Sequence, residues 1–301
     1  MHAEVKKILE DIKSIKIQGA RNIAKAVLNA IKIEVAHSKS VKELMANIVE
    51  IRNILMQTRK TEPMARNLIE VSTRHLLSYA SLSDKEAIKK LLEDSDKIIQ
   101  ELDKYYNKML EYGAEHIPDG AVIITICHSS SVVGVLKKAK EMGKEINVIN
   151  CETRPLFQGR ITARELVNAG IKVTHIIDSE AAVFIKKCDS ALVGADAIDV
   201  EGNLYNKVGT RMLAELCYNY NVSFHPISEL LKYDPKTLFG KLEPIEYRSP
   251  DEIWQGYPDG IKILNPAFDY VPAELIKSYI TEEGILHPHE IKHEFEKKYK
   301  L

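Results

Sequence analysis

The chain has 301 residues, of which 45% are hydrophobic and 28% are charged, and its 42 basic and 43 acidic residues leave a formal net charge of −1. This balance gives no reason to expect nucleic acid or an anionic membrane surface as a partner. The length and the apolar content are those of a soluble globular protein with a large core, divided between two domains.

No apolar stretch approaches the roughly 20 residues that a membrane-spanning helix needs, and the N-terminus lacks the apolar segment of a signal peptide. We therefore expect a cytoplasmic protein. The cysteines are Cys127, Cys151, Cys188 and Cys217, and they follow no CxxC spacing. The sequence thus suggests neither a zinc site nor a disulfide framework, and we expect no metal and no cofactor.

Residues 1–116 show a helical pattern and no convincing strand. Apolar residues recur at positions i, i+3, i+4 and i+7 in five successive segments, the first of which starts at Val5. Ser83 and Glu86 form a capping-box pattern at the start of the last and longest segment. We predict an N-terminal helical domain over residues 1–116.

Two connections in this helical region carry residues that suit an anion. Gly19 and Ala20 stand beside Arg21 just before a helix, where free backbone N–H groups and the positive end of the helix dipole favour negative charge. Arg59 lies in the loop Thr58-Arg59-Lys60-Thr61, which precedes another helix. The alternative is that both are ordinary helix linkers, and the spacing alone leaves this open.

From Gly120 onward, short apolar strands alternate with helical segments. The predicted strands cover residues 121–126, 146–151, 173–177, 190–193 and 222–226. Repeated strand–helix units of this length indicate a doubly wound parallel sheet with right-handed crossovers. We predict a Rossmann-like α/β domain over residues 117–301.

Cys127 and Asp196 each come just beyond a predicted buried strand. In open parallel sheets, ligands bind in the crevice outside the carboxyl ends of the strands, so both side chains should face one pocket. Taken singly, a cysteine here is more often buried packing, and an aspartate is more often a helix N-cap.

Other polar residues follow the same strand ends. Arg154, beside Gln158, is a candidate phosphate ligand, and the alternative is a structural partner of a carboxylate. Asn206 and Lys207 follow closely after Asp196 and are either turn residues or substrate contacts.

Five motifs, in one order, resemble the initiation factor 2B alpha/beta/delta family over residues 15–285. The motifs are Glu152-Thr153-Arg154-Pro155, Gln158-Gly159, Gly194-Ala195-Asp196, Asn206-Lys207-Val208-Gly209-Thr210 and Asn265-Pro266-Ala267-Phe268-Asp269. The family includes regulatory subunits of a guanine-nucleotide exchange factor and two isomerases, which act on ribose 1,5-bisphosphate and on methylthioribose 1-phosphate. Any one motif would be weak, whereas their common order makes the resemblance strong.

The resemblance implies the isomerase branch, because Thr-X-Cys and Gly-Ala-Asp segments carry its catalytic residues and here supply Cys127 and Asp196. The C-terminal segments resemble the archaeal ribose-1,5-bisphosphate isomerases most, which implies conversion of this sugar phosphate to ribulose 1,5-bisphosphate in AMP salvage. The implied substrate-binding residues are Gly19, Ala20, Arg21, Arg59, Arg154, Gln158, Asn206 and Lys207. The resemblance also implies AMP as an activator and a homo-oligomer, either a dimer or a hexamer.

Two alternatives stay open. One is a methylthioribose-1-phosphate isomerase. The other is a non-catalytic regulatory subunit that binds a nucleotide or sugar phosphate and contacts initiation factor 2. A purely regulatory surface has no reason to carry both Cys127 and Asp196, which favours an enzyme.

The sequence departs from the family pattern near these motifs. Gln18 stands where the family usually has Arg, which removes a cation near the expected phosphate, and Arg21 either compensates for it or points elsewhere. His128 replaces an Asn, and Ile126 replaces a His. These differences bear on substrate identity more than on fold.

The implied chemistry needs an acid and a base. A phosphate on the anomeric oxygen keeps the sugar from opening to a free aldehyde, so one group must protonate the ring oxygen and another must take the proton from the adjacent carbon. The resemblance implies Cys127 as the thiolate base and Asp196 as the acid. We therefore expect a lowered pKa for Cys127, helped by His128, Lys207 and the following helix N-terminus, and a raised pKa for Asp196.

Overall fold

The computed structural model describes residues 1–301 apart from 59–60, 241–242, 244 and 301. The chain begins with α1 (Ala3–Lys13), α2 (Ala20–His37), α3 (Val41–Thr58), α4 (Pro63–Ser78) and α5 (Asp84–His116). These helices bury the apolar faces read from the sequence, as Val5, Leu9 and Ile12 of α1 illustrate. The predicted helical region is confirmed, and so is the capping box of Ser83 and Glu86.

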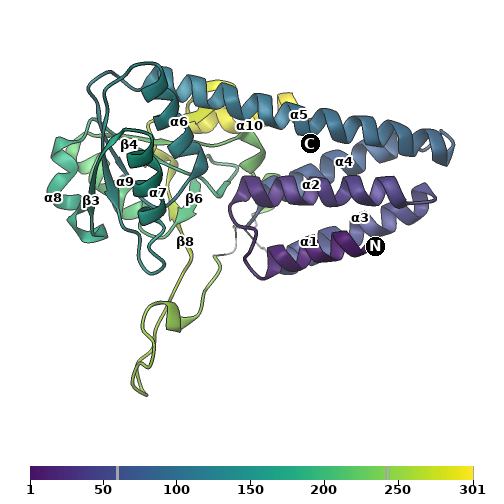
Figure 1. The fold of residues 1–301 in the computed structure, drawn as a ribbon, viewed down its shortest axis with the longest axis horizontal. Helices are drawn as coiled ribbons and strands as arrows, with labels where there is room; N and C mark the ends of the chain where they lie inside the picture. Colours follow the sequence, from purple (N-terminus) through teal and green to yellow (C-terminus); the bar gives the residue numbers. More distant parts are fainter. Residues whose placement is uncertain (59–60, 241–242, 244, 301) are drawn as a thin grey trace.

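Helix α5 runs from the helical region along the sheet region (Figure 1), where it packs on α6 (Ser130–Glu141). Glycines permit this close packing: a Cβ at Gly113 would lie 2.6 Å from a methyl carbon of Val135, and one at Gly134 would lie 2.8 Å from Leu110. Helix α6 is thereby fixed against the helical region. Because α5 contacts both regions, the domain boundary after residue 116 stays a prediction.

The second region is built on a five-stranded parallel sheet with the order β3-β2-β1-β4-β7. Its strands are β1 (Val122–Thr125), β2 (Asn147–Cys151), β3 (Lys172–Ile176), β4 (Ser190–Val193) and β7 (Ser223–Pro226). Helices α6, α7 (Gly159–Asn168), α8 (Ala181–Phe184) and α9 (Thr210–Tyr220) connect the strands. The predicted Rossmann-like fold is confirmed, and the strand order reverses between β1 and β4, the place where such sheets bind ligands.

A small antiparallel sheet, which the sequence pattern did not predict, lies beyond β4. It has the order β5-β6-β8, with β5 (Ala197–Ile198), β6 (Leu204–Lys207) and β8 (Phe268–Val271). The hairpin of β9 (Tyr279–Thr281) and β10 (Gly284–Leu286) and the helix α10 (Ile291–Tyr299) complete the chain. The pairing of β6 with β8 places residues 204–207 beside residues 268–271, which are far apart in the sequence.

Between β7 and β8 the chain forms short 3-10 turns and then a long loop that projects from the body (Figure 1). The turns between β7 and β8 are Leu230–Lys232, Pro235–Phe239 and Pro250–Glu252. The other 3-10 turns in the described part of the chain are Asp178–Glu180, Ile185–Lys187, Ala273–Leu275 and Pro288–Glu290. The projecting loop exposes Tyr247, Trp254 and Leu264.

Among the described helices, none has the length and apolar character needed to cross a bilayer.

Candidate active site

Cys127 lies two residues beyond the end of the central strand β1. Its backbone is left-handed, with φ of 69°, a conformation uncommon for a residue other than glycine. Burial raises the pKa of its thiol to about 11, the carboxylates of Asp196 and Asp178 add to the rise, and Lys207 is the main opposing influence. In the unliganded protein Cys127 is therefore a neutral thiol at neutral pH.

Asp196 follows β4, the strand beside β1. Its N–H donates to the carbonyl of Tyr205 at 2.9 Å, which ties the aspartate to β6. Burial raises its pKa, while Lys207 and Lys232 oppose the rise. The raised pKa is the direction that a general acid needs.

The loops that carry the two residues touch. A Cβ at Gly194 would lie 2.8 Å from both the Cβ and the Oγ of Ser129, so only glycine permits this contact. Lys207 influences both Cys127 and Asp196 electrostatically. The structure thus brings Cys127, Asp196 and Lys207 near one another at the point where the strand order reverses. That Cys127 and Asp196 face one ligand pocket stays a prediction.

The β6 end carries Asn206 and Lys207. The Asn206 amide donates to Thr210 Oγ1 at 3.0 Å, and Lys207 Nζ lies 5.0 Å from the centre of the Phe268 ring. The turn that follows is held by Asp269, whose Oδ2 accepts from the N–H groups of Gly209 at 2.7 Å and Arg211 at 3.1 Å. The sequence motif pointed to Asn206 and Lys207 but not to the anchoring role of Asp269.

Gln158 and Lys207 line one small pocket, together with Arg248 and Asn265 from the projecting loop. The Oε1 atom of Gln158 is buried and accepts no hydrogen bond from any described residue, so it is available to a ligand. Arg154 differs: its guanidinium donates to the carbonyls of Ile253 at 2.8 Å and Pro155 at 3.2 Å. Phosphate binding by Arg154 stays a prediction.

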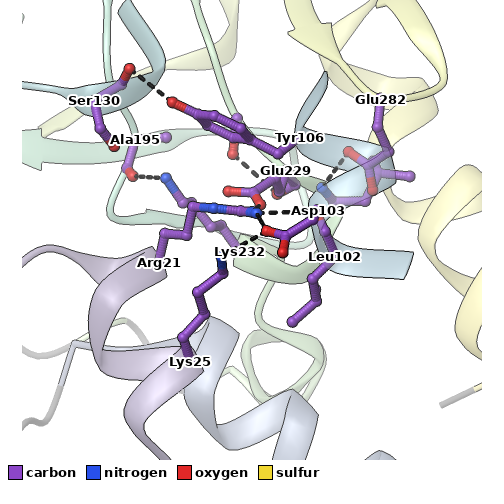
Figure 2. A network of polar contacts seen from close by, with 12 residues as sticks. Arg21, Lys25, Leu102, Asp103, Tyr106, Ser130, Ala195, Glu229, Lys232 and Glu282 are labelled. Carbon is purple, nitrogen blue, oxygen red and sulfur yellow. Dashed lines mark hydrogen bonds and ion pairs between the residues drawn. The ribbon is translucent and has the colours of Figure 1, made fainter. Parts of the chain in front are cut away.

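Arg21 belongs to a network of polar contacts between the helical region and the sheet region (Figure 2). It donates to the buried Glu229, to Asp103 at 2.9 Å and to the carbonyl of Leu102 at 3.0 Å, and its guanidinium lies 4.2 Å from the centre of the Tyr106 ring. Two carboxylates already neutralise this cation. We therefore do not expect Arg21 to replace the arginine that the family usually has at the position of Gln18.

The remaining residues of the predicted phosphate loops are Gly19, Ala20 and Arg59. Gly19 is the N-cap of α2, with φ of 83°, and Ala20 is the buried first residue of that helix. Arg59 lies outside the described residues. Their contacts with substrate stay predictions.

Two sequence-based expectations about the cysteine need correction. The pKa of Cys127 is raised rather than lowered, because burial outweighs Lys207. His128 does not supply positive charge, because burial lowers the pKa of its imidazole and keeps it neutral near pH 7. The N–H of His128 and the side chain of Lys207 are what favour the thiolate.

Alkylation of Cys127 by iodoacetamide should show this protonation state. Only the thiolate attacks, so we expect the rate to keep rising with pH toward about 11 in the unliganded protein. Lys207→Met should move the midpoint higher, because it removes the main opposing charge. Mass spectrometry of the Cys127 peptide after short exposures measures this, and a rate that levels off by about pH 8 would contradict the burial argument.

The fold and the site together define a Rossmann-like protein with a cysteine, an aspartate and a lysine close together at the switch point of its parallel sheet. The family model described as the initiation factor 2 subunit family matches residues 16–288. The chain belongs to this family, which confirms the resemblance seen in the motifs.

Curated relatives match over nearly the full length. The ribose 1,5-bisphosphate isomerase of Pyrococcus furiosus is 38% identical, covering 95% of this chain and 91% of the relative. The Methanocaldococcus jannaschii protein of the same name is 37% identical, covering 94% and 92%. The methylthioribose-1-phosphate isomerase of Acetivibrio thermocellus is 34% identical, covering 93% and 87%.

Solved structures share the fold. A Pyrococcus horikoshii protein described as translation initiation factor eIF-2B superposes with a TM-score of 0.80 at 27% identity, covering 96% of this chain and 98% of that one. A 5-methylthioribose 1-phosphate isomerase from the same organism gives 0.78 at 26% identity, covering 97% and 87%. Two kinds of solved protein, one described as an initiation factor and one as an isomerase, thus resemble this chain in structure.

Proposed function

We propose that this protein is an aldose–ketose isomerase that converts ribose 1,5-bisphosphate to ribulose 1,5-bisphosphate. The observation that carries the proposal is the placement of Cys127 and Asp196 at the carboxyl ends of the neighbouring strands β1 and β4, with Lys207 acting on both. Curated relatives at 37–38% identity bear the name of this isomerase, which supports the choice of substrate.

In the proposed reaction, protons move between two protein groups and the sugar. Asp196 donates a proton to the ring oxygen as its bond to C1 breaks, and the Cys127 thiolate takes the proton from C2, which gives an enol. C1 then receives a proton from Cys127, and the C2 hydroxyl returns a proton to Asp196 as the ketone forms. Both groups end in the state in which they began.

The resting thiol is compatible with this scheme. A thiol with a carboxylate carries the same number of protons as a thiolate with a carboxylic acid, so the reactive form requires a redistribution and not a loss of protons. The burial that raises the pKa of Asp196 favours its protonated form, and Lys207 favours the thiolate. Lys207 would also contact a substrate phosphate, with Asn206 and Gln158 beside it.

A direct assay tests the proposal. Purified protein is incubated with ribose 1,5-bisphosphate and, separately, with methylthioribose 1-phosphate, and the ketose product is measured, with Cys127→Ser as the blank. We expect turnover of the bisphosphate above the blank. Turnover of methylthioribose 1-phosphate alone would assign the second isomerase activity, which relatives at 34% identity carry by name. Turnover of neither would favour a regulatory subunit.

The proposal extends to assembly and regulation. We propose a homo-oligomer, a dimer or a hexamer, in the cytoplasm, with AMP as an activator. The exposed Tyr247, Trp254 and Leu264 of the projecting loop are apolar surface that a second copy would cover. Light scattering that finds a monomer at micromolar concentration would rule out the assembly, and turnover unchanged by AMP would rule out the activation.

A further inference from the structure

We infer that Thr153 and Thr162 are positioning residues that clamp the backbone of Cys127 and so aim its sulfur at the reacting carbon. The inference rests on the proposed function for the identity of the base. The geometry of the clamp itself does not depend on the substrate.

The two threonines bind the two backbone polar groups of Cys127. The N–H of Cys127 donates to Thr153 Oγ1 at 2.7 Å, and its carbonyl accepts from Thr162 Oγ1 at 2.9 Å. Both threonines are about 1% exposed, so water does not compete for these hydroxyls. One threonine follows β2 and the other lies in α7, so the clamp closes on Cys127 from two separate elements.

Thr153 is itself held in place. Its hydroxyl lies 3.2 Å from the carbonyl of Cys151, to which it donates, and this leaves a lone pair for the N–H of Cys127. The Asp178 carboxylate accepts from the N–H groups of Thr153 and Arg154, each at 2.8 Å. The backbone of Thr153 is left-handed, with φ of 64°, as that of Cys127 is. The Asp178 carboxylate bonds the N–H of Thr153 in that conformation.

Thr162 is held from its other side by His128. Since the Thr162 hydroxyl proton goes to the carbonyl of Cys127, the contact of 3.1 Å with His128 Nδ1 requires that Nδ1 carry the hydrogen and donate. The lowered pKa of His128 fits this neutral tautomer. His128 Nε2 lies 3.7 Å from Glu165 Oε1, on the same helix as Thr162. His128 thus acts through Thr162 on the cysteine backbone.

The consequence is a fixed direction for the Cα–Cβ bond of Cys127, which limits the positions that the sulfur can reach. In a left-handed residue whose N–H and carbonyl are both bound, the peptide planes on either side cannot rotate without breaking one of the two hydrogen bonds. The side chain is left with rotation about its Cα–Cβ bond alone. A displacement of about 1 Å at a reacting group can cost on the order of 10²-fold in rate, so the clamp has a measurable effect on catalysis.

The test compares valine with serine at each threonine. Valine removes the hydroxyl and keeps the shape, whereas serine keeps the hydroxyl. We expect Thr153→Val and Thr162→Val to lower kcat by about 10- to 100-fold with KM changed less than about threefold, and the serine variants to recover most of kcat. Thr73→Val is the matched control, because within the described part of the chain the Thr73 hydroxyl bonds only a carbonyl of its own helix α4.

Alkylation of Cys127 gives a second readout that needs no substrate. Burial is the main cause of the high pKa of Cys127, which is half-buried, so a loosened Cys127 should become more exposed to water, and its alkylation midpoint should fall from about 11 toward the ordinary value near 9. Serine variants and Thr73→Val should keep the wild-type midpoint. Where a valine variant does not fold, Thr153→Ala or Thr162→Ala replaces it, and melting temperature confirms the fold.

The two readouts separate the inference from the proposed function. Valine variants with wild-type kcat and a wild-type alkylation midpoint would overturn the clamp, whether or not the protein is an isomerase. A shifted midpoint that serine restores, in a protein that turns over neither sugar phosphate, would uphold the clamp and overturn the proposed function. Equal losses in valine and serine variants would also overturn the clamp, because the hydroxyl would then not be the cause.

Discussion

Cys127→Ser and Asp196→Asn are each expected to lower turnover by about 10²- to 10⁴-fold, or about 3 to 5 kcal/mol, while leaving the fold intact. Each substitution is nearly isosteric and removes one proton-transfer group. Serine is too weak an acid to form an alkoxide beside Lys207, and an amide cannot deliver a proton to the ring oxygen. Much of the substrate affinity should remain, because the phosphates are bound by other residues.

A different result is expected if Cys127 and Asp196 have only structural roles. If Cys127 only fills space and Asp196 only satisfies backbone groups, each variant should lose roughly 1 kcal/mol of stability and keep its turnover per folded molecule. Melting temperature, substrate affinity and turnover measured on the same two variants separate the two cases. Turnover near the wild-type value in both variants would remove the pair from the mechanism.

The sequence was sufficient for the parallel sheet because each strand is a short apolar run followed by a helical segment. It placed Cys127 and Asp196 at strand ends, and the strand order then decides that these ends are neighbours. The order of the strands in the sheet cannot be read from any short segment of the sequence. The right-handed crossover rule and the switch-point rule make a shared pocket the expected result from the sequence alone.

What the sequence could not predict depends on contacts between distant residues. The antiparallel pairing of Asn206 with Asp269 joins segments with no strong strand pattern of their own. The pKa of Cys127 follows from burial, which no motif reports, and so its predicted direction was wrong. No sequence pattern singles out Thr153 or Thr162, because their role depends on a hydroxyl that reaches the end of another strand.

Arg21 illustrates the same limit most clearly, because its partner Glu229 is 208 positions away. The sequence suggested a phosphate ligand at a helix start. The structure instead buries the pair, with side-chain exposures of 10% for Arg21 and 3% for Glu229, between the helical region and the sheet region (Figure 2). Removal of one partner from such a pair leaves a buried charge without compensation.

Arg21→Leu is therefore expected to lower the free energy of unfolding by about 3 to 5 kcal/mol at neutral pH, measured by urea denaturation. The double variant Arg21→Leu/Glu229→Leu should recover most of that loss, because an apolar pair of similar volume is often as stable as a buried ion pair.

The pH dependence of the single variant gives a further check. Burial raises the pKa of Glu229, while Arg21 is the main opposing influence, so loss of Arg21 raises this pKa further. A carboxyl group with a higher pKa in the folded than in the unfolded state takes up protons on folding, and its penalty grows as pH rises above the unfolded value. The destabilisation by Arg21→Leu should thus be smaller at pH 5 than at pH 8. If Arg21 instead binds a phosphate, KM should rise while stability and its pH dependence stay near the wild-type values.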